Sequence, residues 1–341
     1  MTEKQWKDLL RVIDGDILSP LPVGFIIDSP WLPNWAGTTI LDYFSNDAIW
    51  LEANIKAIRD FPDIWFLPGF WSEYGMCTEP SAFGARSNFP QNEFPHAHKV
   101  LRSASEIDDL IVPNPKTDGL LPFTLNRLKL ARAAIEKEGH QIRFAVARGP
   151  LNIASYLMGS TEFLTTMMMD PDRTNALMQK ITGFLKNWLA LQMETFDSID
   201  GILLLDDIIG FVGEEEFKTF GLPYLKKLYD FDVSVKFLHN DAPCEVSAPF
   251  LPEMGINLFN MGFETDLNAL KAATNNKVTM LGNIPPRDVL ASGTVPDITK
   301  SAKDLIDGLE DKSRVIFSCG GGMPPDVSNE QITAFVEAVR K

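Results

Sequence analysis

The chain has 341 residues, 45% of them hydrophobic, which is ample for one large domain and does not exclude two smaller ones. Its formal net charge of −15 argues against binding of nucleic acid, because a phosphate backbone requires clustered Lys and Arg. Three cysteines, no apolar run of the ~20 residues that a membrane helix needs and no signal-peptide pattern lead us to expect a reduced, cytoplasmic protein with no membrane contact.

Short apolar runs rich in branched or aromatic residues alternate along the chain with amphipathic segments of helical length. Eight of these runs predict strands, at 23–27, 64–68, 142–147, 201–206, 233–239, 256–261, 278–283 and 314–319. The intervening segments predict helices at 46–60, 122–138, 151–198 with breaks near 158–161 and at Pro171, 214–229, 245–254, 266–273, 286–291 with 297–310, and 328–340.

Eight strands, each followed by a helix, favour a single (β/α)8 TIM barrel over residues 1–341, since no linker or change of composition divides the chain. A doubly wound sheet is the main alternative. Segment 69–121, rich in Pro, Phe and Asn, is too long for an ordinary loop, so we interpret it as an inserted lid over the barrel mouth.

Polar residues follow the apolar runs at the positions where a barrel carries its active site, the C-terminal ends of the strands. These strand-end residues are Asp28, Trp71, Glu73, Arg148, Asp206, Asp207, His239, Asp241, Asn260, Asn283 and Cys319. Aromatic residues at 65–74 either pack under the lid or line an apolar substrate pocket.

The sharpest chemical pattern is a set of soft-metal ligands at two strand ends, His239 with Asp241 and Cys319. An imidazole, a carboxylate and a thiolate would hold zinc and leave one position open, as in catalytic zinc sites. Asp241 lies two residues after His239, so both side chains point the same way in an extended strand. Cys244 is the alternative middle ligand, because thiolate is softer than carboxylate.

The adjacent acids Asp206 and Asp207 are candidates for general acid–base chemistry, although only one of them can face the barrel axis. Alternatively, one of them orients His239 and the other caps the next helix. Arg148, which precedes a Gly-Pro turn, binds either an anionic substrate group or a buried carboxylate.

Several motifs resemble the uroporphyrinogen decarboxylase superfamily over most of the chain. They are GPLNIASYLMG (149–159), DDIIGFVGEEEFKTFGLPYLKKL (206–228), FLHND (237–241), MLGNIPP (280–286) and FSCGGGMPPDVSNEQITAF (317–335). Within it, the chain looks closer to corrinoid-dependent methyltransferases such as methylcobalamin:coenzyme M methyltransferase. The decarboxylases carry an N-terminal arginine-rich motif, whereas Arg11 is the only arginine in residues 1–50.

The resemblance also implies a metal site, because those methyltransferases bind zinc through a His-x-Cys and a later Cys. The matching positions are His239, Asp241 and Cys319, so a carboxylate replaces the middle thiolate. An oxygen ligand makes zinc a stronger Lewis acid, which favours a poor leaving group such as the oxygen of an aromatic methyl ether.

The expected activity is therefore zinc-dependent transfer of a methyl group between a small methylated substrate and a corrinoid (methylcobalamin) carried by a small partner protein. Asp206 and Asp207 are the expected catalytic residues, and Trp71, Glu73, Arg148, Asn152, Asn260 and Asn283 the expected substrate-binding residues. A related decarboxylase and a non-catalytic corrinoid or small-molecule binding protein remain as alternatives, and a homodimer is compatible with the sequence.

Overall fold

The structure is a computed structural model that describes residues 1–27 and 31–341. Its strands are β1 (Gly24–Ile26), β2 (Trp65–Leu67), β3 (Ser87–Asn88), β4 (His96–Ala97), β5 (Phe144–Arg148), β6 (Gly201–Leu205), β7 (Val235–Asn240), β8 (Leu258–Met261), β9 (Thr279–Ile284) and β10 (Val315–Cys319). Its α-helices are α1 (Glu3–Asp14), α2 (Trp31–Ala36), α3 (Ile40–Ser45), α4 (Asp47–Asp60), α5 (Thr78–Ala82), α6 (Leu121–Lys137), α7 (Pro150–Met158), α8 (Ser160–Met169), α9 (Pro171–Thr195), α10 (Glu214–Glu216), α11 (Leu222–Leu228), α12 (Leu267–Ala273), α13 (Val295–Gly308) and α14 (Asn329–Arg340). Shorter 3-10 or π turns are η1 (Ala104–Ile107), η2 (Asp207–Phe211), η3 (Phe217–Gly221), η4 (Ala248–Phe250) and η5 (Pro286–Ala291).

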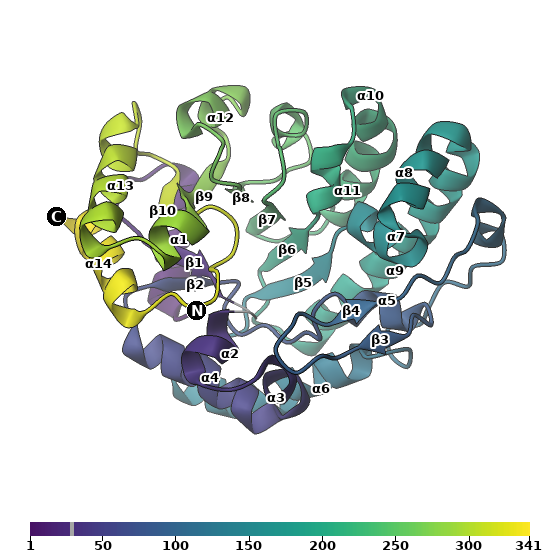
Figure 1. Cartoon of the computed structure of the whole chain (residues 1–341), viewed down its shortest axis with the longest axis horizontal. Coiled ribbons are helices and arrows are strands. Elements are labelled where there is room, and N and C mark those ends of the chain that lie inside the picture. The colour runs from purple at the N-terminus through teal and green to yellow at the C-terminus, as the bar shows by residue number, and fades with distance from the viewer. Residues whose placement is uncertain (28–30) are drawn as a thin grey trace.

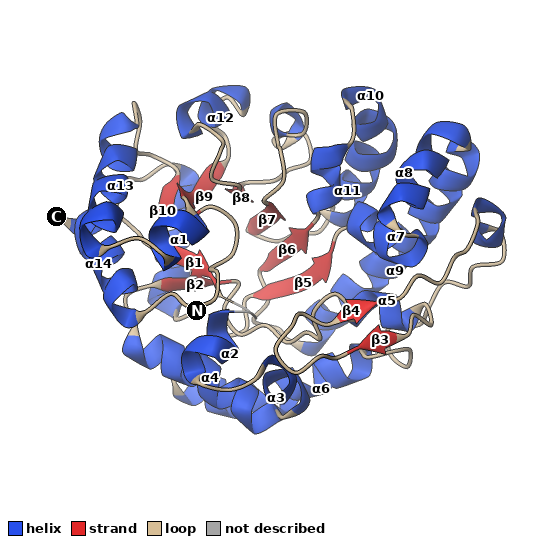
Figure 2. Cartoon of the chain, in the orientation of Figure 1, coloured by secondary structure: helices blue, strands red, loops and turns tan. Residues whose placement is uncertain are grey.

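All eight predicted strands are present and parallel to their neighbours. Six of them form one sheet in the order β10-β9-β8-β7-β6-β5, and β1 pairs with β2. A parallel bridge between Val23 and Phe317 joins β1 to β10, so the eight strands follow one another around the centre of the molecule, with helices outside (Figures 1 and 2). This arrangement is consistent with a TIM barrel.

The expected closed barrel is not complete, because the described residues contain no ladder between β2 and β5. Side chains instead form hydrogen bonds with the edge of β5 that no strand pairs with. Gln192 of α9 accepts from the N–H of Val146 and donates to its carbonyl, both at 3.0 Å, and Glu79 accepts from the N–H of Arg148 at 3.0 Å. Since the backbone groups of an edge strand need partners when buried, these side chains replace a neighbouring strand along this seam between β2 and β5.

Two hydrophobic clusters lie on the two faces of the strands. The inner cluster includes Phe144, Leu203, Phe237, Leu281 and Ile316, whereas the outer cluster packs the other strand face against the helices. Alternation along each strand produces this division. Barrel interiors are filled in the same way, so the centre is a packed core and the open space lies at its ends.

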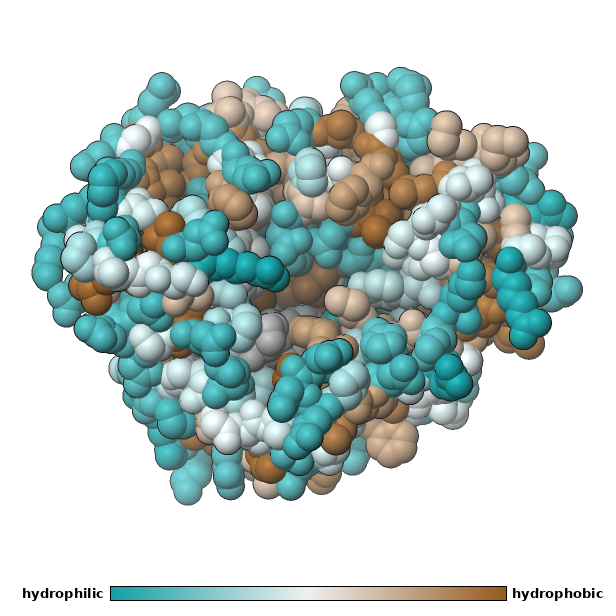
Figure 3. Space-filling view, viewed as in Figure 1, coloured by the Kyte–Doolittle hydropathy of each residue, from teal (hydrophilic) through white to brown (hydrophobic). Residues whose placement is uncertain are grey.

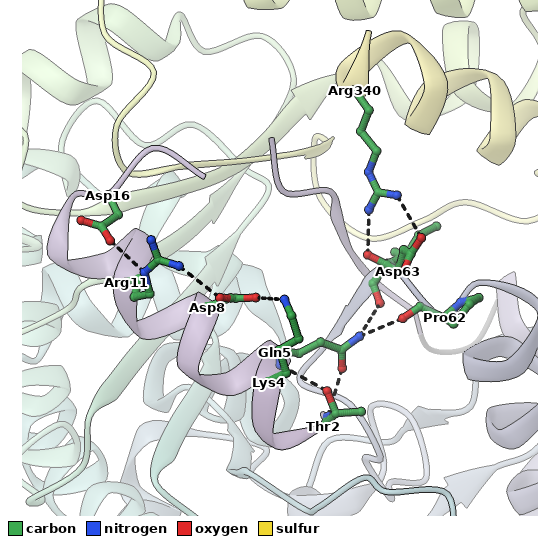
Figure 4. Close-up of polar contacts among 10 residues, drawn as sticks. Thr2, Lys4, Gln5, Asp8, Arg11, Asp16, Pro62, Asp63 and Arg340 are labelled. Atoms are coloured by element: carbon green, nitrogen blue, oxygen red, sulfur yellow. Dashed lines mark hydrogen bonds and ion pairs between the residues drawn. The ribbon is translucent and has the colours of Figure 1, made fainter. Parts of the chain in front are cut away.

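Helix α1 belongs to the inner cluster through Trp6, Leu9 and Val12. A capping box between Thr2 and Gln5 begins the helix. Figure 4 shows its polar contacts, in which the Gln5 amide donates to the carbonyl of Pro62 at 3.2 Å. No helix was predicted for residues 3–14 from the sequence.

The predicted helices agree with the structure except at 245–254, where only the short turn η4 forms. Pro249 and Pro252 remove two backbone N–H donors from this stretch and clash with a continuing helix. The expected lid, 69–121, holds α5, β3, β4 and η1. None of the described helices is both long and apolar enough to cross a membrane.

Candidate metal centre and its cavity

Three side chains converge at the C-terminal ends of β6 and β7. His239 lies within β7, Asp241 follows that strand directly, and Asp207 begins the turn η2 after β6. One ligand atom from each residue lies within 4.8 Å of the other two, and His239 Nε2 is 3.8 Å from Asp207 Oδ1. This group of one nitrogen and two oxygen donors is the Asp207–His239–Asp241 cluster.

Asn260, on the neighbouring strand β8, fixes the orientation of the His239 ring. The side-chain amide of Asn260 donates to the carbonyl of Leu281 at 2.7 Å, so its Oδ1, 2.7 Å from His239 Nδ1, is the acceptor of that pair. His239 therefore donates from Nδ1, and Nε2, which faces Asp207, is the nitrogen that a metal ion would use. Metal-binding histidines are commonly oriented by a partner of this kind.

The two carboxylates of the cluster lie close enough to oppose one another electrostatically. The backbone N–H of Asp241 donates to Asp207 Oδ1 at 3.2 Å. Burial raises the pKa of Asp241, His239 opposes this shift, and the neighbouring Asp207 raises the pKa further. A bound cation would offset this repulsion, and an imidazole with two carboxylates is a donor set that zinc accepts. The residues present thus fit a zinc ion.

Cys319, the third expected ligand, does not join the cluster. Its side chain belongs to the outer hydrophobic cluster and is fully buried, which raises the pKa of the thiol to about 12. Cys244, the alternative ligand, is also buried there, with its Sγ 3.5 Å from Thr265 Oγ1. The structure brings Asp207 beside His239 and Asp241 instead of either thiol.

The paired acids Asp206 and Asp207 face different surroundings. Asp206 is fully buried and accepts from the backbone N–H groups of Leu151 and Asn152, at 3.0 and 2.9 Å, at the start of α7. Gly149 leaves room for this contact, since a Cβ there would lie 2.2 Å from Asp206 Oδ2. Burial raises the pKa of Asp206 well above its usual range. Asp206 therefore holds α7, while Asp207 faces the cluster.

A cavity of ≈ 300 Å³ opens beside the cluster. Its lining residues are Ile26, Met76, Phe94, Arg148, Asn152, Tyr156, Leu205, Asp207, His239, Asp241, Pro286, Arg287, Gly320, Gly322, Met323, Pro324 and Pro325. Figure 3 shows this face of the molecule hollowed near its centre, with hydrophilic and hydrophobic residues around the hollow.

Of the expected substrate-binding residues, Arg148 and Asn152 line this cavity. Asn152 reaches Asp207 Oδ2 through its side-chain nitrogen at 3.4 Å. Asn260 acts on His239 instead, and Asn283 donates to the carbonyl of Thr265 at 2.7 Å, which ties β9 to the loop after β8.

The aromatic and acidic residues after β2 are not among the lining residues. Trp71 belongs to the inner hydrophobic cluster, and of the two alternatives for the aromatic residues at 65–74, lining of this cavity is not observed. Glu73 is buried and accepts from the guanidinium of Arg148 at 2.6 Å. Burial raises the pKa of Glu73, and Arg148 opposes that shift.

Arg148 is paired with a second acid, because Glu79 Oε2 lies 3.6 Å from its guanidinium. Burial alone would lower the pKa of Arg148, but the carboxylates of Glu73 and Glu79 raise it above the usual range. Of the two alternatives for Arg148, the structure shows the pairing with buried carboxylates; Arg148 also lines the cavity, and binding of an anionic substrate group stays a prediction.

Met76, Phe94, Tyr156 and Arg287 are among the lining residues that were not predicted from the sequence. Met76 and Phe94 come from the expected lid, which supports its placement near the cavity. Tyr156 lies one helical turn after Asn152 on α7, and burial raises the pKa of its hydroxyl to about 12. Arg287 follows the motif MLGNIPP directly, so its strand-end position was a usable signal. Asp28, also expected at a strand end, lies outside the described residues.

The sequence and the fold both resemble those of known proteins. The family model described as "Uroporphyrinogen decarboxylase (URO-D)" matches residues 8–341. The uroporphyrinogen decarboxylase of Chloroherpeton thalassium is 25% identical over 77% of this chain and 76% of its own length. That of Klebsiella pneumoniae subsp. pneumoniae is 24% identical over 100% of this chain and 98% of its own length. A methyltransferase from Methanosarcina mazei shares the fold, with a TM-score of 0.80 and 19% identity over 97% of this chain and 96% of that chain. The chain belongs to the uroporphyrinogen decarboxylase (URO-D) family.

Proposed function

We propose that this protein is a zinc-dependent methyltransferase that moves a methyl group between a small methylated donor and a corrinoid carried by a separate protein. The observation that carries the proposal is the Asp207–His239–Asp241 cluster at the edge of a cavity, with a histidine whose free nitrogen faces the carboxylates. The likeness in fold to a methyltransferase agrees with it.

The side chains around the cluster have separate roles in this reaction. His239 Nε2 and the carboxylates of Asp207 and Asp241 would hold the zinc ion, and Asn260 keeps the imidazole in position. When bound, zinc would supply Lewis acidity to the heteroatom from which the methyl group leaves. Tyr156, protonated at neutral pH because its pKa is about 12, can donate a hydrogen bond to that heteroatom as it gains electron density.

An aromatic methyl ether is the donor that this ligand set favours, because two oxygen ligands leave more positive charge on the metal than thiolates would. In such a transfer the carbon–oxygen bond of the ether would break with its electron pair left on the oxygen, and the reduced corrinoid of the partner protein would supply the electron pair that takes up the methyl group. The exposed side chains of Phe211 and Phe263, which follow β6 and β8, offer apolar contact area for the corrinoid protein at this end of the strands.

Decarboxylation of a porphyrinogen is the second candidate, favoured by the names of the curated relatives. Two features argue against it. A cavity of ≈ 300 Å³ is at the lower end of the ~300–1,000 Å³ of ligand pockets, so a tetrapyrrole is a poor fit. Arg11, on α1, pairs with Asp8 and Asp16 and does not line the cavity, so among the described lining residues only Arg287 offers a cation without an ion-pair partner to the several carboxylates of a porphyrinogen.

The test combines metal content with turnover. We expect about one zinc per chain, lost in His239→Ala, Asp207→Ala and Asp241→Ala but retained in Cys319→Ala and Cys244→Ala, by elemental analysis. Wild-type enzyme with reduced corrinoid protein should demethylate methyl ethers, read from the cobalt absorbance. Porphyrinogen turnover without corrinoid, or a wild type that stays empty after incubation with zinc, would overturn the proposal.

A further inference from the structure

We infer that Arg287 is a specificity residue that binds a carboxylate on the substrate. The inference rests on the proposed function and deepens it, because it assigns the methyl donor to the class of carboxylated aromatic ethers. It starts from the distribution of charge around the cavity.

Two lining residues carry a permanent positive charge, Arg148 and Arg287. Arg148 is buried and held between Glu73 and Glu79, so its charge is already neutralised within the protein. By contrast, no hydrogen bond or ion pair reaches the guanidinium of Arg287 from any residue that the structure describes. Its backbone carbonyl accepts from the N–H of Ser292 at 3.0 Å.

Within residues 1–27 and 31–341, the guanidinium of Arg287 has no partner that would give it a structural role. Arg287 is exposed, so its charge remains solvated and costs the fold little. Several other exposed arginines of the chain pair with nearby acids, as Arg59 does with Glu138 and Arg173 with Asp108. A planar guanidinium whose donors are all available matches a carboxylate in a two-point contact.

The position of Arg287 suits a group distant from the reacting atom. Arg287 lies in η5 after β9, whereas His239 and Asp241 come from the end of β7, and β8 lies between these strands. The ligand would thus place its methyl-bearing atom at the Asp207–His239–Asp241 cluster and its carboxylate at Arg287.

The cavity wall between these polar points is apolar. Lining residues Met76, Phe94, Leu205 and Met323 can contact a hydrocarbon ring. The volume of ≈ 300 Å³ suits a compact ligand of one ring. The chain as a whole is negative, at −15, so a local cation is needed if an anionic substrate is to be selected.

The test measures binding of ortho-, meta- and para-methoxybenzoate, with methoxybenzene as the neutral comparison, by isothermal titration calorimetry. We expect Arg287→Ala to weaken binding of the preferred methoxybenzoate roughly 10- to 100-fold, the equivalent of one charge-assisted contact, and to leave methoxybenzene unchanged. Arg287→Lys keeps the charge without the planar fork, so its affinity for the methoxybenzoate should lie between those of Arg287→Ala and the wild type.

Arg102→Ala is the matched control, because Arg102 is exposed, has no side-chain partner among the described residues and does not line the cavity. It should bind like the wild type. Equal binding of methoxybenzoate by Arg287→Ala and wild type, an equal loss for both ligands, or a wild type that binds none of the methoxybenzoates would overturn the inference.

The titration is done without corrinoid protein, on protein with and without zinc. Failure of the proposed function would then appear as absence of metal and of methyl transfer, with the Arg287-dependent preference for the carboxylate intact. Failure of this inference would appear as metal binding and methyl transfer with no dependence on Arg287.

Discussion

Replacing each of the adjacent acids Asp206 and Asp207 by alanine should separate stability from metal binding. Asp206→Ala removes the acceptor of two buried N–H groups at the start of α7. At ~1–3 kcal/mol for each unsatisfied buried donor, with partial relief by water, the loss of unfolding free energy should be about 3 kcal/mol. With ~2.1 cal/mol/K of unfolding entropy per residue over 341 residues, the melting temperature should fall by roughly 4 °C.

Asp207→Ala is expected to behave differently, because its side chain is 35% exposed. The loss of its contact with the N–H of Asp241 is offset by the removal of carboxylate repulsion, so stability should change by less than about 1 kcal/mol. Zinc binding should nevertheless be lost. Asp206→Asn, which keeps one acceptor oxygen, should lie between Asp206→Ala and the wild type in stability.

The assay is urea unfolding and calorimetry in the presence of a chelator, so that bound metal does not stabilise the folded state. Zinc content is measured on parallel samples. A stable Asp206→Ala protein that has lost zinc, or an Asp207→Ala protein as destabilised as Asp206→Ala, would refute the assignment of the two roles.

Two further predictions concern histidines. Asn260→Ala should weaken zinc binding about 10- to 100-fold by releasing the His239 ring, whereas Asn283→Ala should not; calorimetric titration of zinc checks this, and equal affinities in all three proteins would contradict it. Burial lowers the pKa of His140 to about 4, so the unfolded chain takes up the proton first and stability should fall as pH drops from about 6.5 to 4. The full shift corresponds to about 3.4 kcal/mol, which solvent screening at this partly exposed ring reduces to about 1–2 kcal/mol. His140→Gln should flatten that dependence in urea unfolding at pH 7 and pH 4.5, and an unchanged slope would count against the effect.

The strands were predictable because each is a short apolar run buried on both faces, a pattern that the sequence displays directly. Their pairing was not. The edge of β5 is satisfied by Gln192, a glutamine in the middle of a long helix, and nothing local marks it as a substitute for a strand. Helix α1 was missed although Thr2 and Gln5 have the spacing of a capping box.

The Asp207–His239–Asp241 cluster was predicted in part, and strand parity explains why Cys319 lies apart from it. His239 and Asp241 were expected because they are possible metal ligands at the end of an apolar run, and both line the cavity. Cys319 lies three residues after Ile316, which faces the inner cluster, and an odd offset turns its side chain outward. The direction in which the Asp207 side chain points depends on where β6 ends and η2 begins. Sequence patterns locate such a boundary poorly, so Asp207 was not predicted as a metal ligand.

The seam between β2 and β5 is the part of the barrel wall at which two neighbouring strands can separate most easily. Separating two paired strands breaks a row of cooperative backbone hydrogen bonds, but parting these two breaks only contacts made by side chains. Arg148 lies on one side of the seam, and Glu73 and Glu79 follow β2 on the other side. The ion pairs of Arg148 with these two acids therefore connect the two sides. Local opening should begin there, with fast amide hydrogen exchange in β2 while β6 to β9 stay protected. Opening along this line would leave the Asp207–His239–Asp241 cluster, at the C-terminal ends of β6 and β7, undisturbed.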